Sequence, residues 1–162
     1  MTIIRFKSFN HAFHVEIHEN VLNDIKKECM KANAKETGGI LIGSYSKEGD
    51  KATISNITGP PRDSKQHSCG FERGVNGLIK LLDSKWDSSS RKYYIGEWHF
   101  HPNSSPKPST IDDKQMKQLS VDKLLKCPEP ILLIVGGNQD EGWKLSLHLY
   151  KKDSKLALIK EN

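Results

Sequence analysis

The sequence contains few cysteines, and their placement excludes two classes of small protein. Three occur in 162 residues, at Cys29, Cys69 and Cys127, and no two of them form a CxxC pair. An odd number at wide spacing fits neither a disulfide framework nor a cysteine-rich zinc knuckle. We therefore predict three free thiols in a reducing compartment.

The sequence also lacks a long apolar run. The longest, PILLIV at residues 130–135, is far shorter than a membrane span and suits a buried strand. Residues 1–13 contain neither the apolar stretch nor the small-residue cleavage site of a signal peptide. These absences predict a cytoplasmic protein that has no membrane partner.

Charge of one sign is not concentrated anywhere along the chain. The 25 Lys and Arg residues exceed the 20 Asp and Glu residues, which gives a formal net charge of +5. The basic residues alternate with acidic ones, as in KKE, DDK and KKD, and form no dense block with interleaved aromatic residues. The pattern disfavours nucleic acid as a partner, although a basic surface can attract an acidic protein.

The hydrophobic pattern changes along the chain between the period of a helix and that of a strand. Apolar residues at helical spacing predict helices over residues 19–34, about 72–86 and 109 to about 125. Alternating or continuous apolar segments predict strands over residues 2–17, 38–45, 51–58, 93–101, 130–136, 143–151 and 156–160. Residues 62–70 are polar and are predicted to form a loop. This order indicates an α/β protein, with one domain over residues 1–162 and a mixed central sheet flanked by helices.

Two histidines and an aspartate have the spacing of a metal site. His99 and His101 are two apart on a predicted strand, so their side chains share one face of the sheet. Pro102 ends that strand, and Asp112 lies about one turn into the next predicted helix. Two imidazole nitrogens and one carboxylate oxygen leave a fourth tetrahedral position for water, as in catalytic zinc sites. We predict one metal ion per chain, bound by these three residues, with zinc as the expected ion; the same donors can also hold other divalent ions.

Two further residues have the chemistry that a hydrolytic zinc site requires. A water that attacks a carbonyl needs a base to take its proton, and Glu36, just before a glycine-rich strand, is the candidate. Ser109, three residues before Asp112, can direct its hydroxyl at an oxyanion. Ser109 also stands where a helix N-cap belongs, and both roles are compatible. Glu97, next to the histidines, is expected to be structural and to point to the other face of the sheet.

These five positions resemble the JAMM motif of the MPN family of metalloproteases. The motif comprises Glu36 with its glycine-rich strand, H-x-H-P at residues 99–102 and S-x-x-D at residues 109–112. The segments ETGGILIG and GEWHFHP are similar to the prokaryotic branch, and the similarity covers residues 36–138. The resemblance implies a deaminase-like α/β sandwich. It also implies a role for each motif position: zinc ligands at His99, His101 and Asp112, a general base at Glu36 and oxyanion stabilisation at Ser109.

The resemblance further implies a protein substrate. Many relatives cleave the isopeptide bond between the C-terminus of a ubiquitin-like protein and a lysine. Some prokaryotic relatives belong to antiphage (CBASS-like) operons, where they reverse conjugation by E1- and E2-like enzymes, in some cases of a nucleotidyltransferase. The small size and the GEWHFHP segment favour this subgroup. The chain looks too short for the insertions with which eukaryotic deubiquitinases hold ubiquitin chains.

Alternative functions remain open at this point. A peptidase that matures a carrier-protein precursor would cut a linear peptide bond with the same zinc chemistry. A non-catalytic MPN scaffold would lack one or more motif residues, whereas all five are present here. A zinc deaminase of nucleotides requires H-x-E followed by P-C-x-x-C, and the sequence has neither. His67 and Cys69 lie in the loop that borders the predicted site and are assigned no role.

Overall fold

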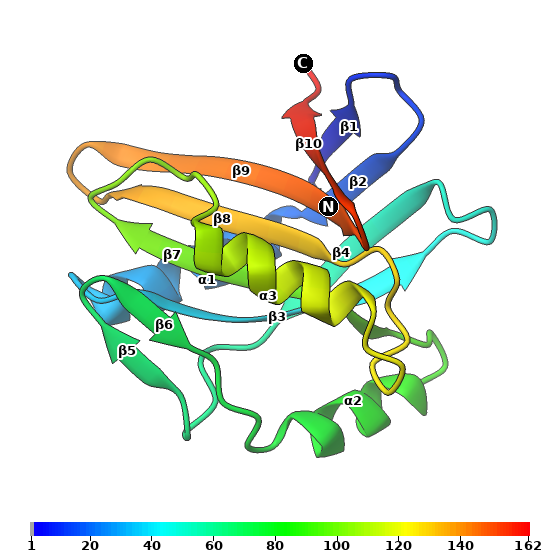
Figure 1. Cartoon of the computed structure of the whole chain (residues 1–162), viewed down its shortest axis with the longest axis horizontal. Coiled ribbons are helices and arrows are strands. Elements are labelled where there is room, and N and C mark those ends of the chain that lie inside the picture. Colours follow the sequence, from blue (N-terminus) through cyan, green and yellow to red (C-terminus); the bar gives the residue numbers. More distant parts are fainter. Residues whose placement is uncertain (1) are drawn as a thin grey trace.

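The computed structural model describes residues 2–162 and is built around a curved mixed sheet (Figure 1). In this part of the chain eight strands close into a barrel in the order β1-β10-β9-β8-β7-β3-β4-β2. Neighbouring strands are antiparallel, except that β2 runs parallel to β4 and β7 parallel to β8. The barrel strands are β1 (Ile3–Ser8), β2 (His14–His18), β3 (Thr37–Tyr45), β4 (Lys51–Ile57), β7 (Tyr93–Pro102), β8 (Ile131–Asn138), β9 (Gly142–Lys151) and β10 (Ser154–Lys160).

The mixed α/β class predicted from the sequence is confirmed, but the sheet is not an open layer. Strands β1 and β10, from opposite ends of the sequence, pair in antiparallel fashion, with Phe6 opposite Lys160. This pairing closes the sheet on itself. None of the helices described has the length and apolarity that a membrane span requires.

Helices lie against both faces of the sheet. Helix α1 (Glu19–Ala32) packs Val21, Leu22, Ile25 and Cys29 against the side chains inside the curved sheet. On the outer face, Leu78 of α2 (Leu78–Trp86) packs on Ile40 and Ile42 of β3. Helix α3 (Thr110–Ser120) packs Met116 on Leu132 and Ile134 of β8. Strands β3 and β8 therefore have buried side chains on both faces, which explains their continuous apolar sequences.

A β-bulge on β7 changes which residues face the outer helices. In the pairing with β3, Leu41 is opposite Gly96 and Ile42 is opposite Tyr94, so Ile95 has no partner. Ile95, at the bulge, points into the inner core at an odd-numbered position. Beyond the bulge the inward positions are even-numbered, at Trp98 and Phe100. A bulge inserts one residue and shifts the alternation of the residues that follow. Residues 97, 99 and 101 are thereby placed on the outer face, the side on which α3 packs.

Three predicted segments differ from the structure. Residues 62–70 were expected to be a loop, but β5 (Lys65–His67) and β6 (Gly70–Glu72) form a two-stranded hairpin outside the barrel. The helix predicted from about residue 72 begins only at Leu78, after Gly77 in the left-handed conformation at φ 79°. The helix predicted to reach about residue 125 ends at Ser120, and turns follow it.

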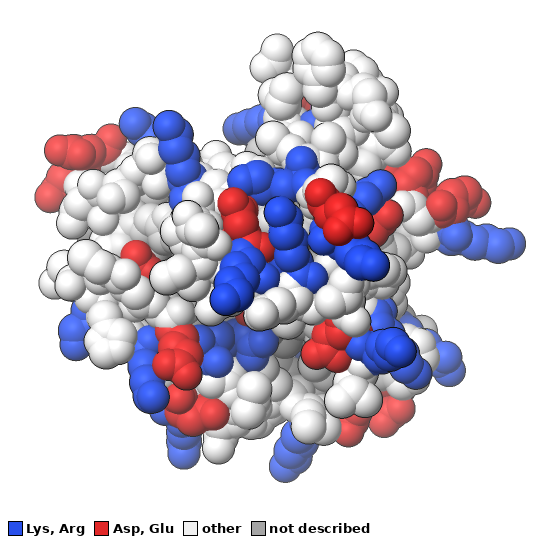
Figure 2. Space-filling model, in the orientation of Figure 1, with Lys and Arg blue, Asp and Glu red and all other residues white. Residues whose placement is uncertain are grey.

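Basic and acidic side chains are mixed on the face that carries α3 (Figure 2). Lys and Arg side chains gather near the middle of this face, and Asp and Glu side chains lie among them. Contacts such as Lys155 with Asp113, at 3.1 Å, pair the two signs directly. The view agrees with the mixed charge pattern of the sequence, which lacks the continuous basic stripe typical of nucleic-acid binding.

Candidate metal centre

The end of β7 presents three chemically active side chains on one face. Intervals of two residues separate Glu97 from His99 and His99 from His101. In an extended strand this spacing turns all three side chains to the same face. The expectation that Glu97 points to the other face is therefore wrong. Glu97 and His99 border the same small cleft beside α3. Strand β7 pairs with β3 on one side and β8 on the other, which fixes the direction of these side chains.

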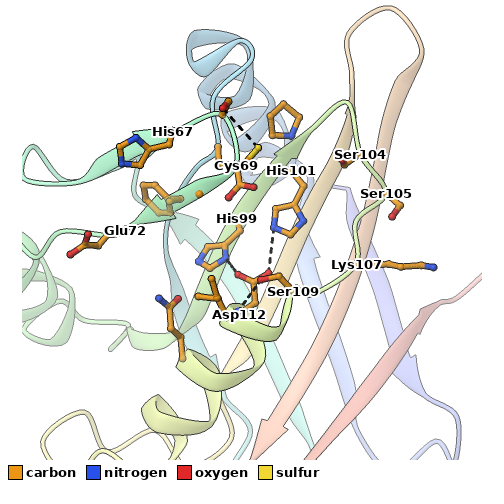
Figure 3. Close-up of a pocket in the computed structure, with 17 residues that line it drawn as sticks. His67, Cys69, Glu72, His99, His101, Ser104, Ser105, Lys107, Ser109 and Asp112 are labelled. Carbon is orange, nitrogen blue, oxygen red and sulfur yellow. Dashed lines mark hydrogen bonds and ion pairs between the residues drawn. The ribbon is translucent and has the colours of Figure 1, made fainter.

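Asp112 reaches the histidines from the first turn of α3. Ser109 caps this helix: its Oγ accepts the backbone N–H of Asp112 at 3.1 Å, and its own backbone N–H donates to Asp112 Oδ2 at 2.8 Å. Such a capping box fixes both side chains relative to the helix end. Asp112 Oδ1 lies 2.9 Å from His99 Nδ1, and Oδ2 lies 3.4 Å from His101 Nε2 (Figure 3). The N-cap predicted for Ser109 is thus confirmed.

These three side chains form a donor set suited to a metal ion. One ligand atom from each of His99, His101 and Asp112 can be chosen so that all lie within 4.8 Å of one another. His99 and Asp112 are each only 6% exposed, while His101 is partly exposed toward the cleft. Two imidazole nitrogens and one carboxylate are a common set for zinc, and three protein ligands leave a position for water or substrate. The donors present therefore fit the predicted ion.

The electrostatics of the set keep Asp112 ionised. Burial alone would raise its pKa, but the imidazoles of His101 and His99 and the backbone N–H of Ser109 hold it well below its ordinary value. The same contact with Asp112 raises the pKa of His101, against the opposing effect of burial. A carboxylate that stays charged is the form that binds a metal.

Glu36 lies in the same cleft, immediately before β3. The cleft has a volume of about 650 Å³ and is bordered by all five residues of the predicted motif, by the β5–β6 hairpin, and by Pro102, Ser104, Ser105 and Lys107. Burial raises the pKa of Glu36, while the charge of His101 lowers it and that of Asp112 raises it. A carboxylate that borders a cleft beside a candidate metal-ligand set, but is not part of that set, is a type of group that can act as a general base.

The segment that contains His67 and Cys69 was expected to be a loop beside the site, but its hairpin structure and its contacts with the site were missed by sequence reasoning. Its carbonyl at His67 accepts the backbone N–H of Glu36 at 2.8 Å, and the Phe71 ring meets the His99 ring edge-on at 5.8 Å. His67, Cys69 and Glu72 also border the cleft (Figure 3). The signal in the sequence was weak, because two three-residue strands with the mostly polar segments KQH and GFE have too little hydrophobic pattern to be recognised.

The remaining predicted features concern thiols. Within residues 2–162 all three cysteines are free, with Cys29 and Cys127 buried and Cys69 exposed. Burial raises the pKa of the Cys29 thiol to about 12 and that of Cys127 to about 11. Both are therefore neutral, packed side chains, as expected of cysteines outside a disulfide or metal framework.

The fold and the donor set together define a candidate metalloprotein of mixed α/β architecture. Residues 18–147 match the model of the family described as prokaryotic homologs of the JAB domain, and the chain belongs to this family. The resemblance to the prokaryotic branch of the MPN family, drawn from the motif, is thereby confirmed.

Relatives at the level of single proteins agree with this assignment. The chain is 39% identical over 143 residues to a "CD-NTase/cGAS isopeptidase" of Enterobacter hormaechei subsp. hoffmannii, covering 88% of this chain and 78% of that protein. It is 34% identical over 106 residues to a protein of the same name from Escherichia coli, covering 65% of this chain and 64% of the relative. A "Probable metalloprotease y4qB" of Sinorhizobium fredii is 26% identical over 129 residues, covering 78% of this chain and 77% of that protein.

A solved structure shows the same fold. The solution structure of protein DSY2949 from Desulfitobacterium hafniense superposes with a TM-score of 0.59, covering 90% of this chain and 88% of that one. The sequences are 19% identical, so this likeness concerns the fold alone.

Proposed function

We propose that this protein is a zinc-dependent isopeptidase that releases the C-terminus of a ubiquitin-like protein from a lysine of a conjugated target. One observation carries the proposal: a two-histidine, one-aspartate donor set and a separate, partly buried glutamate border the same open cleft. Amide hydrolysis needs a Lewis acid and a base that is not occupied by the metal. His99, His101 and Asp112 would hold the ion, and Glu36 remains available as the base.

The chemistry that zinc would supply is polarisation of the scissile carbonyl and a lowered pKa for an attacking water. Glu36 would accept the proton of that water and deliver it to the leaving amine. Its raised pKa suits both halves of this transfer, because a carboxyl group that is too acidic holds a proton poorly. Asp112 would supply the carboxylate oxygen of the ligand set, in the ionised form that binds a metal.

Ser109 would stabilise the developing oxyanion. Its Oγ already accepts a hydrogen bond from the Asp112 backbone, but the hydroxyl proton is not used in that bond. Ser109 borders the cleft, so this proton can be directed at the oxygen of a bound carbonyl. The cap and the oxyanion donor are therefore functions of the same hydroxyl group.

The substrate class is inferred from the relatives. Several are named CD-NTase/cGAS isopeptidase, which points to a conjugate in a CD-NTase system as the substrate here. On this proposal E1- and E2-like enzymes form the conjugate, a nucleotidyltransferase is the target, and the protein takes part in antiviral defence as a cytoplasmic enzyme. The chain would act as one metalloprotease domain over residues 1–162.

The test is cleavage of an isopeptide-linked conjugate by wild type, Glu36→Gln and the control Glu48→Gln, with zinc content determined on each sample. Glu48 is exposed in the turn between β3 and β4, so its substitution should leave cleavage unchanged. Glu36→Gln should keep one zinc per chain and lose cleavage by about 100-fold or more, as expected on removal of a general base.

The outcomes separate the parts of the proposal. Normal cleavage by Glu36→Gln would refute its role as the base. Purified wild type that takes up no zinc after supplementation would refute the metal mechanism itself. A linear fusion of the same ubiquitin-like protein, assayed in parallel, decides whether the enzyme prefers an isopeptide bond or the linear bond of a precursor.

A further inference from the structure

The β5–β6 hairpin is short, yet it forms part of the wall of the cleft. Each strand has three residues, and the hairpin forms a two-stranded sheet of its own beside the barrel. An isolated hairpin of this size is marginally stable in water. Yet it forms one wall of the cleft, through residues 67–72, and places Phe71 on a proposed metal ligand. The backbone N–H of Glu36 donates to the His67 carbonyl near the hairpin turn, so contacts at the base of the hairpin must supply the rest of its attachment.

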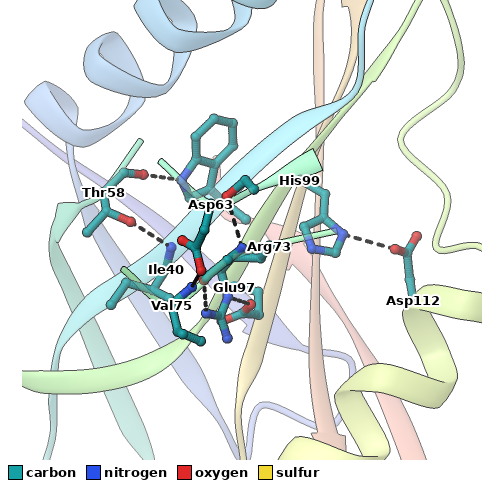
Figure 4. Close-up of polar contacts among 11 residues, drawn as sticks. Ile40, Thr58, Asp63, Arg73, Val75, Glu97, His99 and Asp112 are labelled. Atoms are coloured by element: carbon teal, nitrogen blue, oxygen red, sulfur yellow. Dashed lines mark hydrogen bonds and ion pairs between the residues drawn. The ribbon is translucent and has the colours of Figure 1, made fainter. Parts of the chain in front are cut away.

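A buried ion pair joins that base to β7. Arg73 follows β6 directly, and its Nε donates to Glu97 Oε1, while its Nη1 donates to the Gly74 carbonyl at 2.8 Å (Figure 4). The side chain of Arg73 is 18% exposed and that of Glu97 5%. Both charges are thus largely removed from water, and loss of either one would leave the other buried without its partner. This arrangement restricts Arg73 to one position, unlike a pair on the surface.

The other side of the hairpin base is tied to the same segment. Asp63 accepts the backbone N–H groups of Val75 at 3.0 Å and Asn76 at 2.9 Å, and Ser64 Oγ accepts that of Gly74 at 2.9 Å. These bonds join the chain entering the hairpin to the chain leaving it. Fixing Arg73 on β7 consequently fixes both arms of the hairpin.

The ion pair and the metal centre are neighbours on one strand. Glu97 precedes His99 by two residues and shares its face of β7, and both border a second, smaller cleft of about 310 Å³ beside α3. Phe71, two residues before Arg73, meets His99 edge-on at 5.8 Å. The chain therefore contacts β7 twice in succession, at Glu97 through Arg73 and at His99 through Phe71.

We propose that the Arg73–Glu97 ion pair is a positioning device that holds the β5–β6 hairpin over the cleft and presses Phe71 against His99. Arg73 and Glu97 lie outside the proposed ligand set; they hold in place the hairpin that forms one wall of the cleft. This inference rests on the proposed isopeptidase function for its kinetic consequences, but not for its structural ones.

The test uses the full chain with Arg73→Met, Phe71→Ala and, as a control, Arg5→Met. Arg5 forms an exposed ion pair with Glu16 on the β1–β2 hairpin. Its substitution should leave KM, kcat, zinc content and hydrogen exchange unchanged. Arg73→Met and Phe71→Ala should each raise KM by about tenfold with kcat changed by less than about threefold, because substrate positioning is weakened while Glu36 and the zinc ligands remain. Zinc content should stay at one per chain.

A second measurement is independent of catalysis. Amide hydrogen exchange of residues 65–72 should become about tenfold or more faster in Arg73→Met, with exchange in β7 and β8 unchanged. If Arg73→Met fails to fold, Arg73→Lys tests the same link, because it keeps the charge but cannot donate to Glu97 and to the Gly74 carbonyl with the fixed geometry of a guanidinium. The proposal would be overturned if the folded variants showed unchanged hydrogen exchange in the hairpin and an unchanged KM. It would also be overturned if kcat fell by about tenfold while KM stayed the same. If wild type cleaves no conjugate, the isopeptidase proposal fails, while the exchange result still decides the role of the ion pair.

Discussion

At the scale of single residues, the close packing around the site depends on Gly38. A Cβ at this position would lie 2.3 Å from the Trp98 carbonyl oxygen, 2.8 Å from Phe71 Cε1 and 3.0 Å from His99 Cδ2. Any side chain here would separate β3 from β7 or displace the ring of His99. The glycine that follows Glu36 and Thr37 is therefore what lets the strand carrying the proposed base lie directly beside the strand carrying the proposed ligands.

Ser109 caps α3 and is also the proposed oxyanion donor, and the two roles can be tested on the same substitution. Ser109→Ala should lower the free energy of unfolding by about 1 kcal/mol through loss of the N-cap. It should also reduce kcat by about 100-fold through loss of the oxyanion donor. Ser109→Thr retains the hydroxyl and should retain most of both properties. Urea unfolding and cleavage kinetics on the three proteins check this, and an alanine variant with full kcat would leave Ser109 with the cap alone.

At the scale of elements, the first turn of α3 contacts both the cleft and the strands of the barrel. Ser109 and Asp112 in its first turn face the cleft, whereas the adjacent Asp113 turns to the barrel. Asp113 Oδ1 accepts the hydroxyl of Tyr150 on β9 at 2.6 Å and Nζ of Lys155 on β10 at 3.1 Å. One turn of helix thus fixes the site on one side and its attachment to the sheet on the other.

The pKa of Asp113 makes this attachment dependent on pH. Burial opposes ionisation, but the hydrogen bonds from Tyr150 and Lys155 bring the pKa below its ordinary value. A lowered pKa in the folded state adds stability above the unfolded-state pKa, and that stability is lost as pH falls through the folded-state pKa. Asp113→Asn should therefore cost about 1 kcal/mol at pH 7, since the pair is partly exposed. The difference from wild type should shrink in acid.

Urea unfolding of wild type and Asp113→Asn between pH 7 and the acid range measures this effect. The matched control is Asp24→Asn on α1, whose exposed pair with Lys27 should contribute little at any pH. A difference for Asp113→Asn that stayed constant with pH would show that the lost interaction does not depend on the charge of the carboxylate.

At the scale of the whole molecule, barrel closure joins the two ends of the chain. Strand β10 pairs with both β1 and β9, and Leu158 of β10 belongs to the same core cluster as Phe6 of β1. That core also contains Trp98 and Phe100 of β7, which alternate with the histidines of the site. The strand that carries the proposed metal ligands is therefore supported by a core to which the first and last strands also contribute.

Removal of residues 154–162 should show how far the site depends on closure. Without β10, strands β1 and β9 would each present a free edge, and unpaired edges promote association between chains. We expect the melting temperature to fall by about 10 °C or more and the truncated chain to aggregate on size-exclusion chromatography. Removal of the exposed Asn162 alone retains β10 and the hydrogen bond from Glu161 to β1, and is the control. A truncated monomer with unchanged melting temperature would contradict this view of the fold.

Much of the site was predictable because its signals are local. The two-residue spacing of His99 and His101 on a strand, and the three-residue spacing of Ser109 and Asp112 at a helix start, each follow from the geometry of one element. The α/β class and the main strands were predictable for the same reason. The position of Glu97 was also determined by this spacing, and the expectation that it faced away misapplied the two-residue period.

The tertiary structure decided what depends on contacts between distant segments. Closure of the barrel requires β1 and β10 to meet, and no local pattern encodes that pairing. The hairpin of residues 65–72 lacks a hydrophobic period of its own and is held by Arg73 on Glu97, across 24 residues of sequence. The sequence by itself thus determined which side chains meet at the end of β7. The two-residue spacing of His99 and His101 and the three-residue spacing of Ser109 and Asp112 place them there. Only the folded chain determined the wall that faces them, because that wall is stabilised by long-range burial and pairing.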